Sequence, residues 1–138
     1  RALEVLETAG VPIIGFGTDE FPGFFMASTG LPVDERIDDV KSLAEVIRTQ
    51  RQMGLGSGIL VAQPPPPELS LEPSSIESWL DTALKDAANE RITGKALTPF
   101  LLNRMADLSG GVTLTTNLGL IQSNAALGGR LSVALASE

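Results

Sequence analysis

Val11-Pro12-Ile13-Ile14-Gly15-Phe16 is the stretch that decides the fold class. It is short, apolar and β-branched, and it follows Gly10, so it predicts a buried β-strand. A second apolar run, Ile59–Ala62, has the same character. Amphipathic segments surround the two runs, in the order helix, strand, helix, strand, helix, helix, helix. Helices that alternate with buried strands predict an α/β layered domain.

Two strands make a poor sheet by themselves. We therefore predict an α/β layered domain whose central sheet lies only partly in this chain, with the remaining strands on missing sequence or on a partner chain. A length of 138 residues suits one domain, so residues 1–138 are predicted to form a single α/β segment. The chain opens on Arg1, already in helical register and without an initiator Met. We expect a fragment or a trimmed chain of a longer protein.

The composition excludes several classes of chemistry. With no cysteine and no histidine, the chain has no disulfide, no thiol nucleophile, no histidine-containing triad and no Cys or His metal ligand. A bound metal would be a hard ion such as Mg²⁺ or Mn²⁺ on oxygen ligands. The net charge of −7 without a basic run argues against a nucleic-acid partner. No apolar run approaches the ~18–20 residues of a membrane span, and we expect a cytoplasmic protein.

The loop after the first strand carries Asp19 and Glu20. In α/β sheets, ligands bind at loops that leave strand ends, but a solvated turn is the simpler interpretation of these two acids. Three phenylalanines in the same loop are expected in a core or an interface rather than as a stacking platform: Phe21, Phe24 and Phe25.

Several helix and loop boundaries can be predicted from local chemistry. Asp38-Asp39 can cap a helix that ends near Gly54. The glycines of Gly54–Gly58 follow a helix and precede a strand, so they predict a helix end and strand entry rather than a phosphate loop. Pro64–Pro67 predicts a stiff, extended connector, with a ligand for a proline-reading domain as the alternative. Ser74 and Glu77 form a capping box for the next helix. The apolar stripe expected on that helix consists of Ile76, Trp79, Leu80, Ala83, Leu84, Ala87 and Ala88.

Two helices joined by Gly110-Gly111 are predicted at the C-terminal end. Thr98 with Pro99 fits an N-cap followed by proline at the first helical position. The inward-facing residues expected on the first helix are Leu101, Leu102, Met105 and Leu108. Those expected on the second are Leu114, Leu118, Ile121, Ala125 and Leu135.

Asn117 and Asn124 border the apolar stripe of the second helix. Seven residues of helix place them about 20° apart around the axis. Their spacing alone favours structural amides that cap loops or bind backbone carbonyls. An amide also suits a nucleobase edge, because it offers both a donor and an acceptor. Both interpretations remain open on spacing.

At these residues the chain resembles a known family, the pseudouridine-5′-phosphate glycosidases, also called indigoidine synthase A-like proteins. The elements that carry the resemblance run through nearly the whole chain and are jointly specific. They are Leu3–Gly15, Thr18–Phe25, Arg36–Asp38, Gly94-Lys95 with Thr98–Leu102, Ser109–Gly111, Asn117 and Asn124-Ala125.

The resemblance implies an α/β/α fold, a homotrimer, and reversible cleavage of the C–C bond between uracil and ribose 5-phosphate with Mn²⁺. It implies a Schiff-base lysine, a proton-donating glutamate and a metal-binding aspartate, all upstream of Arg1, so no metal ligand is assigned in this chain. It assigns Asn117 a catalytic place near the reacting base, and Asn124 and Thr98 to substrate binding. The implied partner is a small-molecule nucleotide.

Two departures from the family pattern are Ser123, where the family has asparagine, and Gln63, where asparagine is usual. Two alternatives accompany the glycosidase interpretation. The chain could be a catalytically incomplete or divergent member that acts as a structural or oligomerisation module. It could also be a lyase with a Schiff base on Lys95, although that lysine lies just before a helix start, where a surface position is expected.

Overall fold

The computed structural model describes residues 2–23 and 25–137. Phe24, for which a core or interface position was predicted, lies outside the described residues, as does Arg1. The chain divides into two compact units. Unit 1 comprises Arg1–Gly23, Ala27–Pro64 and Ser123–Glu138, and unit 2 comprises Phe24–Met26 and Pro65–Gln122.

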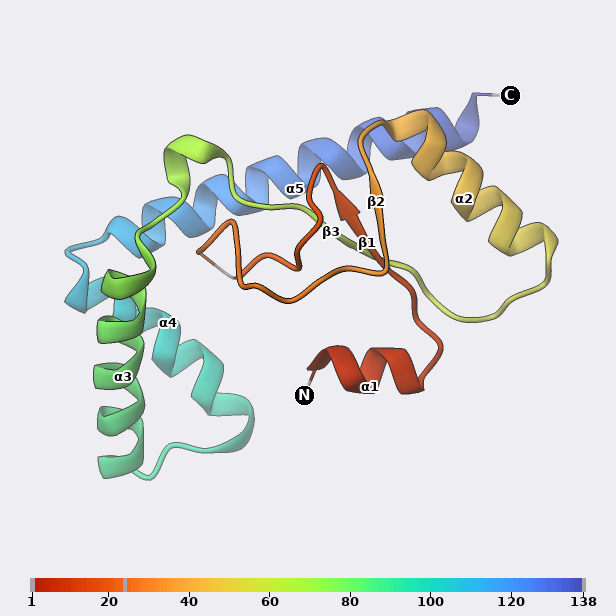
Figure 1. Cartoon of the computed structure of the whole chain (residues 1–138). Helices are drawn as coiled ribbons and strands as arrows, with labels where there is room; N and C mark the ends of the chain where they lie inside the picture. Colours follow the sequence, from red (N-terminus) through yellow and green to blue (C-terminus); the bar gives the residue numbers. More distant parts are fainter. Residues whose placement is uncertain (1, 24, 138) are drawn as a thin grey trace. The chain divides into compact units, whose positions relative to one another are not determined.

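Unit 1 is built on a three-stranded parallel sheet (Figure 1). Its strands are β1 (Ile13–Phe16), β2 (Glu35–Ile37) and β3 (Leu60–Ala62), in the order β2-β1-β3. Ile14 on the central strand lies opposite Glu35 on one side and Val61 on the other. The α/β class and both predicted strands are confirmed. The sequence analysis missed β2, because two of its three residues are exposed charged side chains.

Helices α1 (Ala2–Thr8) and α2 (Val40–Gln52) also belong to unit 1. The predicted cap of α2 is confirmed, since the Asp39 carboxylate accepts hydrogen bonds from the backbone N–H groups of Lys41 and Ser42, both at 2.9 Å. Helix α2 ends just before Gly54, which has a φ of 71°, as the glycine-rich stretch predicted. The core of unit 1 joins Ile14, Ile37 and Leu43, with Leu131 packed against them.

Gly15 brings the loop after β1 directly against the strand. A Cβ atom at this position would lie 2.1 Å from the backbone oxygen of Thr18, far inside van der Waals contact. Only glycine permits this approach of backbone to backbone. The loop that carries Asp19 and Glu20 therefore depends on a residue without a side chain.

Unit 2 is helical. It contains the 3₁₀ turns Pro67–Leu69 and Gly94–Ala96, the helices α3 (Pro73–Asn89) and α4 (Leu97–Leu108), and the first part of α5 (Val112–Ala136). Its core includes Phe25, Ile76, Ala83, Met105 and Leu120, with Trp79 packed against it. The predicted stripe of α3 is thus largely confirmed, although Leu84 is 43% exposed.

Two predicted helix caps are wrong. Helix α3 begins at Pro73 rather than after Ser74, so proline takes the first position and no side chain caps the helix. Helix α4 begins at Leu97, because the preceding 3₁₀ turn continues directly into it. Thr98 is therefore the second residue of α4 and not its N-cap. The predicted turn between α4 and α5 is confirmed, with φ of 63° at Gly110 and 89° at Gly111.

The predicted inward face of α5 is also wrong for its first half. Leu114, Leu118 and Ile121 are 53%, 54% and 57% exposed, whereas Thr113, Thr116 and Leu120 are buried. The buried side is narrow: a Cβ on Gly119 would lie 2.1 Å from Leu69 Cδ1. Small side chains let this side of the helix pack closely, and the large apolar side chains are left outward. Within the described residues, no helix is both long enough and apolar enough to cross a membrane.

Candidate functional site

A hollow of about 540 Å³ in unit 2 contains the predicted residues Thr98 and Asn117. We call it the α4–α5 hollow. Its polar lining side chains include Thr98, Asn103, Asp107 and Asn117, and its apolar lining includes Phe25, Leu102 and Leu114. Two residues assigned to a site by sequence, 19 positions apart, are therefore brought together by the fold.

Helix geometry explains why the polar side chains converge. Asn103 and Asp107 are four residues apart on α4, so they project from the same side of that helix. The Gly110-Gly111 turn reverses the chain, and Asn117 follows on the second turn of α5. Asn117 is half-buried, while Asn103 and Asp107 are exposed. Among the described residues, none of these three side chains forms a hydrogen bond, so their donors and acceptors are available to a ligand.

The start of α5 is fixed by a hydroxyl pair. Ser109 Oγ accepts a hydrogen bond from the Thr113 N–H at 3.1 Å, and the Ser109 and Thr113 hydroxyls lie 3.2 Å apart. Thr113 is only 1% exposed. This pair satisfies an N–H of the first helical turn and holds α5, and with it Asn117, in a fixed direction from the turn.

Asp107 lies in the last turn of α4. The carbonyl end of a helix is electronegative, so a carboxylate there is mildly unfavourable. No basic residue in this turn offsets it. A carboxylate at an unfavourable position, open to a hollow and without a protein partner among the described residues, is a candidate for ligand binding. Neither Asp107 nor Asn103 was predicted from the sequence, although their i, i+4 spacing indicates that both lie on one side of a helix.

Asn124 and Lys95 are both exposed, and neither lines the α4–α5 hollow. The structure therefore does not bring Asn124 into the α4–α5 hollow. For Lys95, exposure argues against a Schiff base, because a reactive amine needs a dry pocket to lower its pKa.

The two departures from the family pattern contact each other. Gln63 Nε2 donates a hydrogen bond to Ser123 Oγ at 2.5 Å, and both residues are partly buried in unit 1. Gln63 is longer than the asparagine usual in the family at its position, and Ser123 is shorter than the family's asparagine. The two positions therefore share one side-chain contact.

Three acidic side chains next to the strands of unit 1, Asp19, Glu20 and Asp38, are engaged within the protein. Arg36 pairs with Asp38 at 2.8 Å and with Asp19 at 2.6 Å, and these two carboxylates raise the pKa of the guanidinium. Glu20 accepts hydrogen bonds from the Ser28 hydroxyl and the Gly30 N–H, and the Ser28 bond is the main cause of its lowered pKa. These contacts support the structural interpretation of the Asp19-Glu20 turn.

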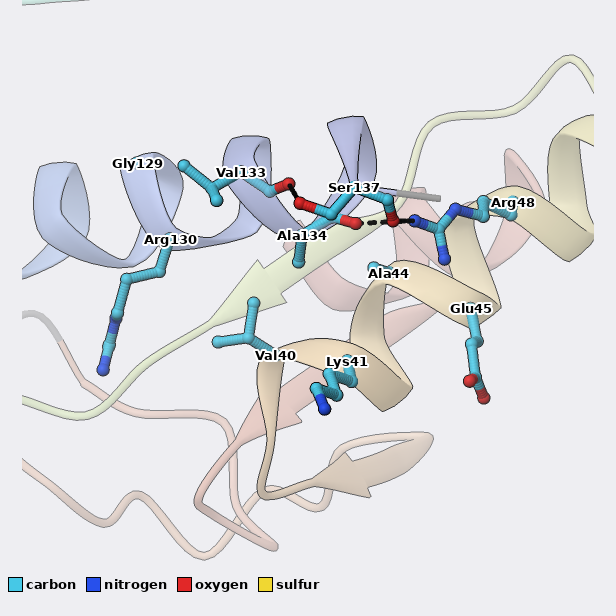
Figure 2. Close-up of a pocket in the computed structure, with 10 residues that line it drawn as sticks. All are labelled: Val40, Lys41, Ala44, Glu45, Arg48, Gly129, Arg130, Val133, Ala134 and Ser137. Atoms are coloured by element: carbon cyan, nitrogen blue, oxygen red, sulfur yellow. Dashed lines mark hydrogen bonds between the residues drawn. The ribbon is translucent and has the colours of Figure 1, made fainter.

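A second, larger hollow of about 720 Å³ lies between α2 and the C-terminal part of α5 in unit 1 (Figure 2). Arg48 is not free there, because it donates to the carbonyl oxygens of Ala134 at 2.6 Å and Ser137 at 3.0 Å. Those carbonyls belong to the last turn of α5 and the residue after it, so Arg48 caps the helix. None of the site residues predicted from sequence lines this hollow.

Residues 2–23 and 25–137 hold no cluster of three or more acidic side chains that could bind a metal ion. The described residues thus do not fit the Mn²⁺ that the resemblance implies.

Comparison with known proteins identifies the family. The family described as Indigoidine synthase A like protein matches residues 1–134. This chain belongs to that family. A pseudouridine-5′-phosphate glycosidase from Caldanaerobacter subterraneus subsp. tengcongensis is 46% identical over 135 residues, which are 98% of this chain and 44% of the relative. One from Methylobacterium nodulans is also 46% identical, over 98% of this chain and 40% of the relative.

Two solved structures of larger chains show the same fold. The prealnumycin C-glycosynthase AlnA in complex with ribulose 5-phosphate matches with a TM-score of 0.86 and 30% identity, over 98% of this chain and 44% of its own. An indigoidine synthase A-like protein from Thermotoga maritima matches with a TM-score of 0.85 and 34% identity, over 96% and 44%. The chain thus spans less than half the length of these relatives.

Proposed function

We propose that this chain forms the base-binding wall of a pseudouridine-5′-phosphate glycosidase, which cleaves the C–C bond between uracil and ribose 5-phosphate. The observation that carries the proposal is the gathering of Asn103, Asp107 and Asn117 around one hollow, without protein partners among the described residues. The glycosidases at 46% identity supply the reaction. The C-glycosynthase relative, in complex with a sugar phosphate, is consistent with C–C chemistry at a phosphorylated sugar.

The hollow matches uracil in its hydrogen-bonding pattern. The free edge of uracil presents an N–H donor between two carbonyl acceptors. The amides of Asn103 and Asn117 can donate to the carbonyls, and the Asp107 carboxylate can accept from the N–H. Thr98 offers a further, exposed hydroxyl in the lining, and Leu102 and Leu114 contribute apolar side chains.

Asn117 has the catalytic role in this proposal. When the C–C bond breaks, its electron pair goes to the base, and negative charge develops on a uracil carbonyl oxygen. An amide N–H donor directed at that oxygen stabilises the charge in the transition state. Asn117 is half-buried, which strengthens such a bond relative to one in water. The Schiff-base lysine and the acid glutamate would come from the part of the family's fold that this chain does not span.

The proposal is tested in a single-chain fusion. The part of the Caldanaerobacter glycosidase that precedes its matched region is joined to residue 1 of this chain, and uracil release from pseudouridine 5′-phosphate is measured. The Asn117→Ala variant should lower kcat about 100-fold, the usual loss for one donor to a developing oxyanion. Asn89→Ala, an exposed asparagine at the end of α3, is the matched control. A folded fusion that releases no uracil, or an unchanged kcat in Asn117→Ala, contradicts the proposal.

The homotrimer implied by the family resemblance is part of the same proposal and is tested by sedimentation of the fusion. A monomeric, active fusion would contradict the trimer alone.

A further inference from the structure

We infer that the outward face of the first half of α5 is the docking surface for the part of the family's fold that this chain does not span. This face, the α5 stripe, consists of Leu114, Leu118 and Ile121. The partner is thus a segment of an indigoidine synthase A-like chain, whether joined to this one or separate.

The first argument is the exposure of the stripe. Its residues follow the i, i+4, i+7 spacing of one helix side, and each is more than half exposed. An amphipathic helix normally turns such a stripe toward a core. Single exposed leucines need no explanation, but a contiguous row of three large aliphatic side chains marks an interaction site. The other side of the same helix segment is already buried through Thr113, Thr116 and Leu120.

The second argument is the amount of polypeptide that is available to cover the stripe. The solved relatives reproduce this chain's fold with TM-scores of 0.85 and 0.86, yet the match accounts for only 44% of each. More than half of each relative therefore lies outside the match and is available to pack on the same framework. The exposed apolar row is where such packing would gain most within α5 of unit 2, because it would remove three large aliphatic side chains from water.

The third argument is continuity with the α4–α5 hollow. Leu114 belongs to both the stripe and the hollow lining. A segment seated on the stripe would also close the hollow from that side and exclude water from Asn117. This step rests on the proposed function, because it gives the docked segment a role in completing the substrate site.

The test is association between separate polypeptides. This chain, carrying an affinity tag, is co-expressed with the part of the Caldanaerobacter glycosidase that precedes its matched region, and the complex is quantified by co-purification and sedimentation. The relative's own matched region, paired with the same segment, sets the reference. We expect this chain to co-purify with the segment, and Leu118→Asp to weaken association at least 10-fold. Leu84→Asp, at an exposed leucine of α3 in the same unit, should leave it unchanged.

Circular dichroism and thermal melts establish that each variant folds, and both substituted leucines are largely outside the core. Failure of this chain to bind a segment that binds the reference overturns the inference. The inference is also overturned if Leu118→Asp binds the segment as well as the unmodified chain does. It is overturned as well if the only effect of Leu118→Asp is to break up oligomers of this chain with itself. Association without uracil release would support the docking surface and count against the proposed function, so the two failures are distinguishable.

Discussion

Asp19, Glu20, Asp34 and Asp39, beside the strands of unit 1, hold hydrogen bonds within the protein, whereas Asp107 at the α4–α5 hollow of unit 2 holds none among the described residues. Asp34 binds the Ile13 N–H at 2.7 Å and Asp39 caps α2. Asp107 and Asn117 face open space. A polar side chain that forms a hydrogen bond with a backbone N–H contributes to stability. A polar side chain at a hollow without such a bond can be replaced at little cost to stability and is available to bind a ligand. The contrast separates structural acids from candidate functional ones.

The largest effect is expected at Gly15, on which the loop with the structural acids depends. In Gly15→Ala the new Cβ would meet the Thr18 carbonyl oxygen, so strand or loop must shift, at a cost of about 3 kcal/mol in the free energy of unfolding. Urea denaturation followed by circular dichroism measures it. Gly58→Ala is the matched control, because nothing lies within 4 Å of its Cβ position. Equal stability of the two variants would show that the loop is not held against β1.

A smaller effect is expected at Asp34, and it tests the comparison directly. In Asp34→Ala the Ile13 N–H loses its acceptor in a partly buried setting, at a cost of about 1–2 kcal/mol in the free energy of unfolding. Asp107→Ala should change stability by less than about 0.5 kcal/mol, with a slight gain, because it removes a carboxylate from a helix C-terminus. Denaturation of both variants side by side gives the difference. If Asp107→Ala lowers the free energy of unfolding more than Asp34→Ala does, the contrast between the acids of the two units is wrong.

The parts of the fold that the sequence predicts are those with a local cause. The strands at Ile13–Phe16 and Leu60–Ala62, the Asp39 cap and the Gly110-Gly111 turn each follow from residues within a few positions. β2 could not be predicted in this way. Its pairing with β1 stabilises a short charged segment that has no strand pattern of its own.

The error on α5 has a different cause. Periodicity shows that a helix has an apolar side, but it does not show which surface covers that side. Here Thr113, Thr116 and Gly119 form the packed side, because their small size permits close approach. The large leucines face outward. In the inferred assembly they contact the part of the family's fold that this chain does not span.

The candidate site was predicted in part. Thr98 and Asn117 do share a hollow, but Thr98 reaches it from within α4 rather than as a cap. Asn103 and Asp107 could not be recognised from their types alone, since exposed polar residues on a helix are usually just solvated. Only the turn that folds α5 back beside α4 gives them a common site.

A modest effect is expected for the Gln63–Ser123 pair, which extends the contrast to a neutral contact in unit 1. Gln63→Ala and Ser123→Ala should each cost about 1 kcal/mol, and the double variant should cost less than the sum by about 0.5–1 kcal/mol. A double-mutant cycle by urea denaturation measures this coupling. Strict additivity would mean that the two departures from the family pattern are independent of each other.

The smallest effect is a pH dependence at the α2 cap. The backbone N–H of Ser42 is the main cause that lowers the pKa of Asp39 below its ordinary value of 3.8. Because the folded pKa is depressed, the stability from this carboxylate is present above pH 3.8 and is lost as the pH falls below 3.8 through the folded value. Asparagine also caps helices but does not titrate. The stability of the unmodified chain relative to Asp39→Asn should therefore be greater at pH 6 than at pH 3. Asp81→Asn, at an exposed position of α3, serves as the control. A difference between the unmodified chain and Asp39→Asn that stays constant across this range would mean that Asp39 caps α2 without depending on its charge, and would remove it from the structural acids that define unit 1.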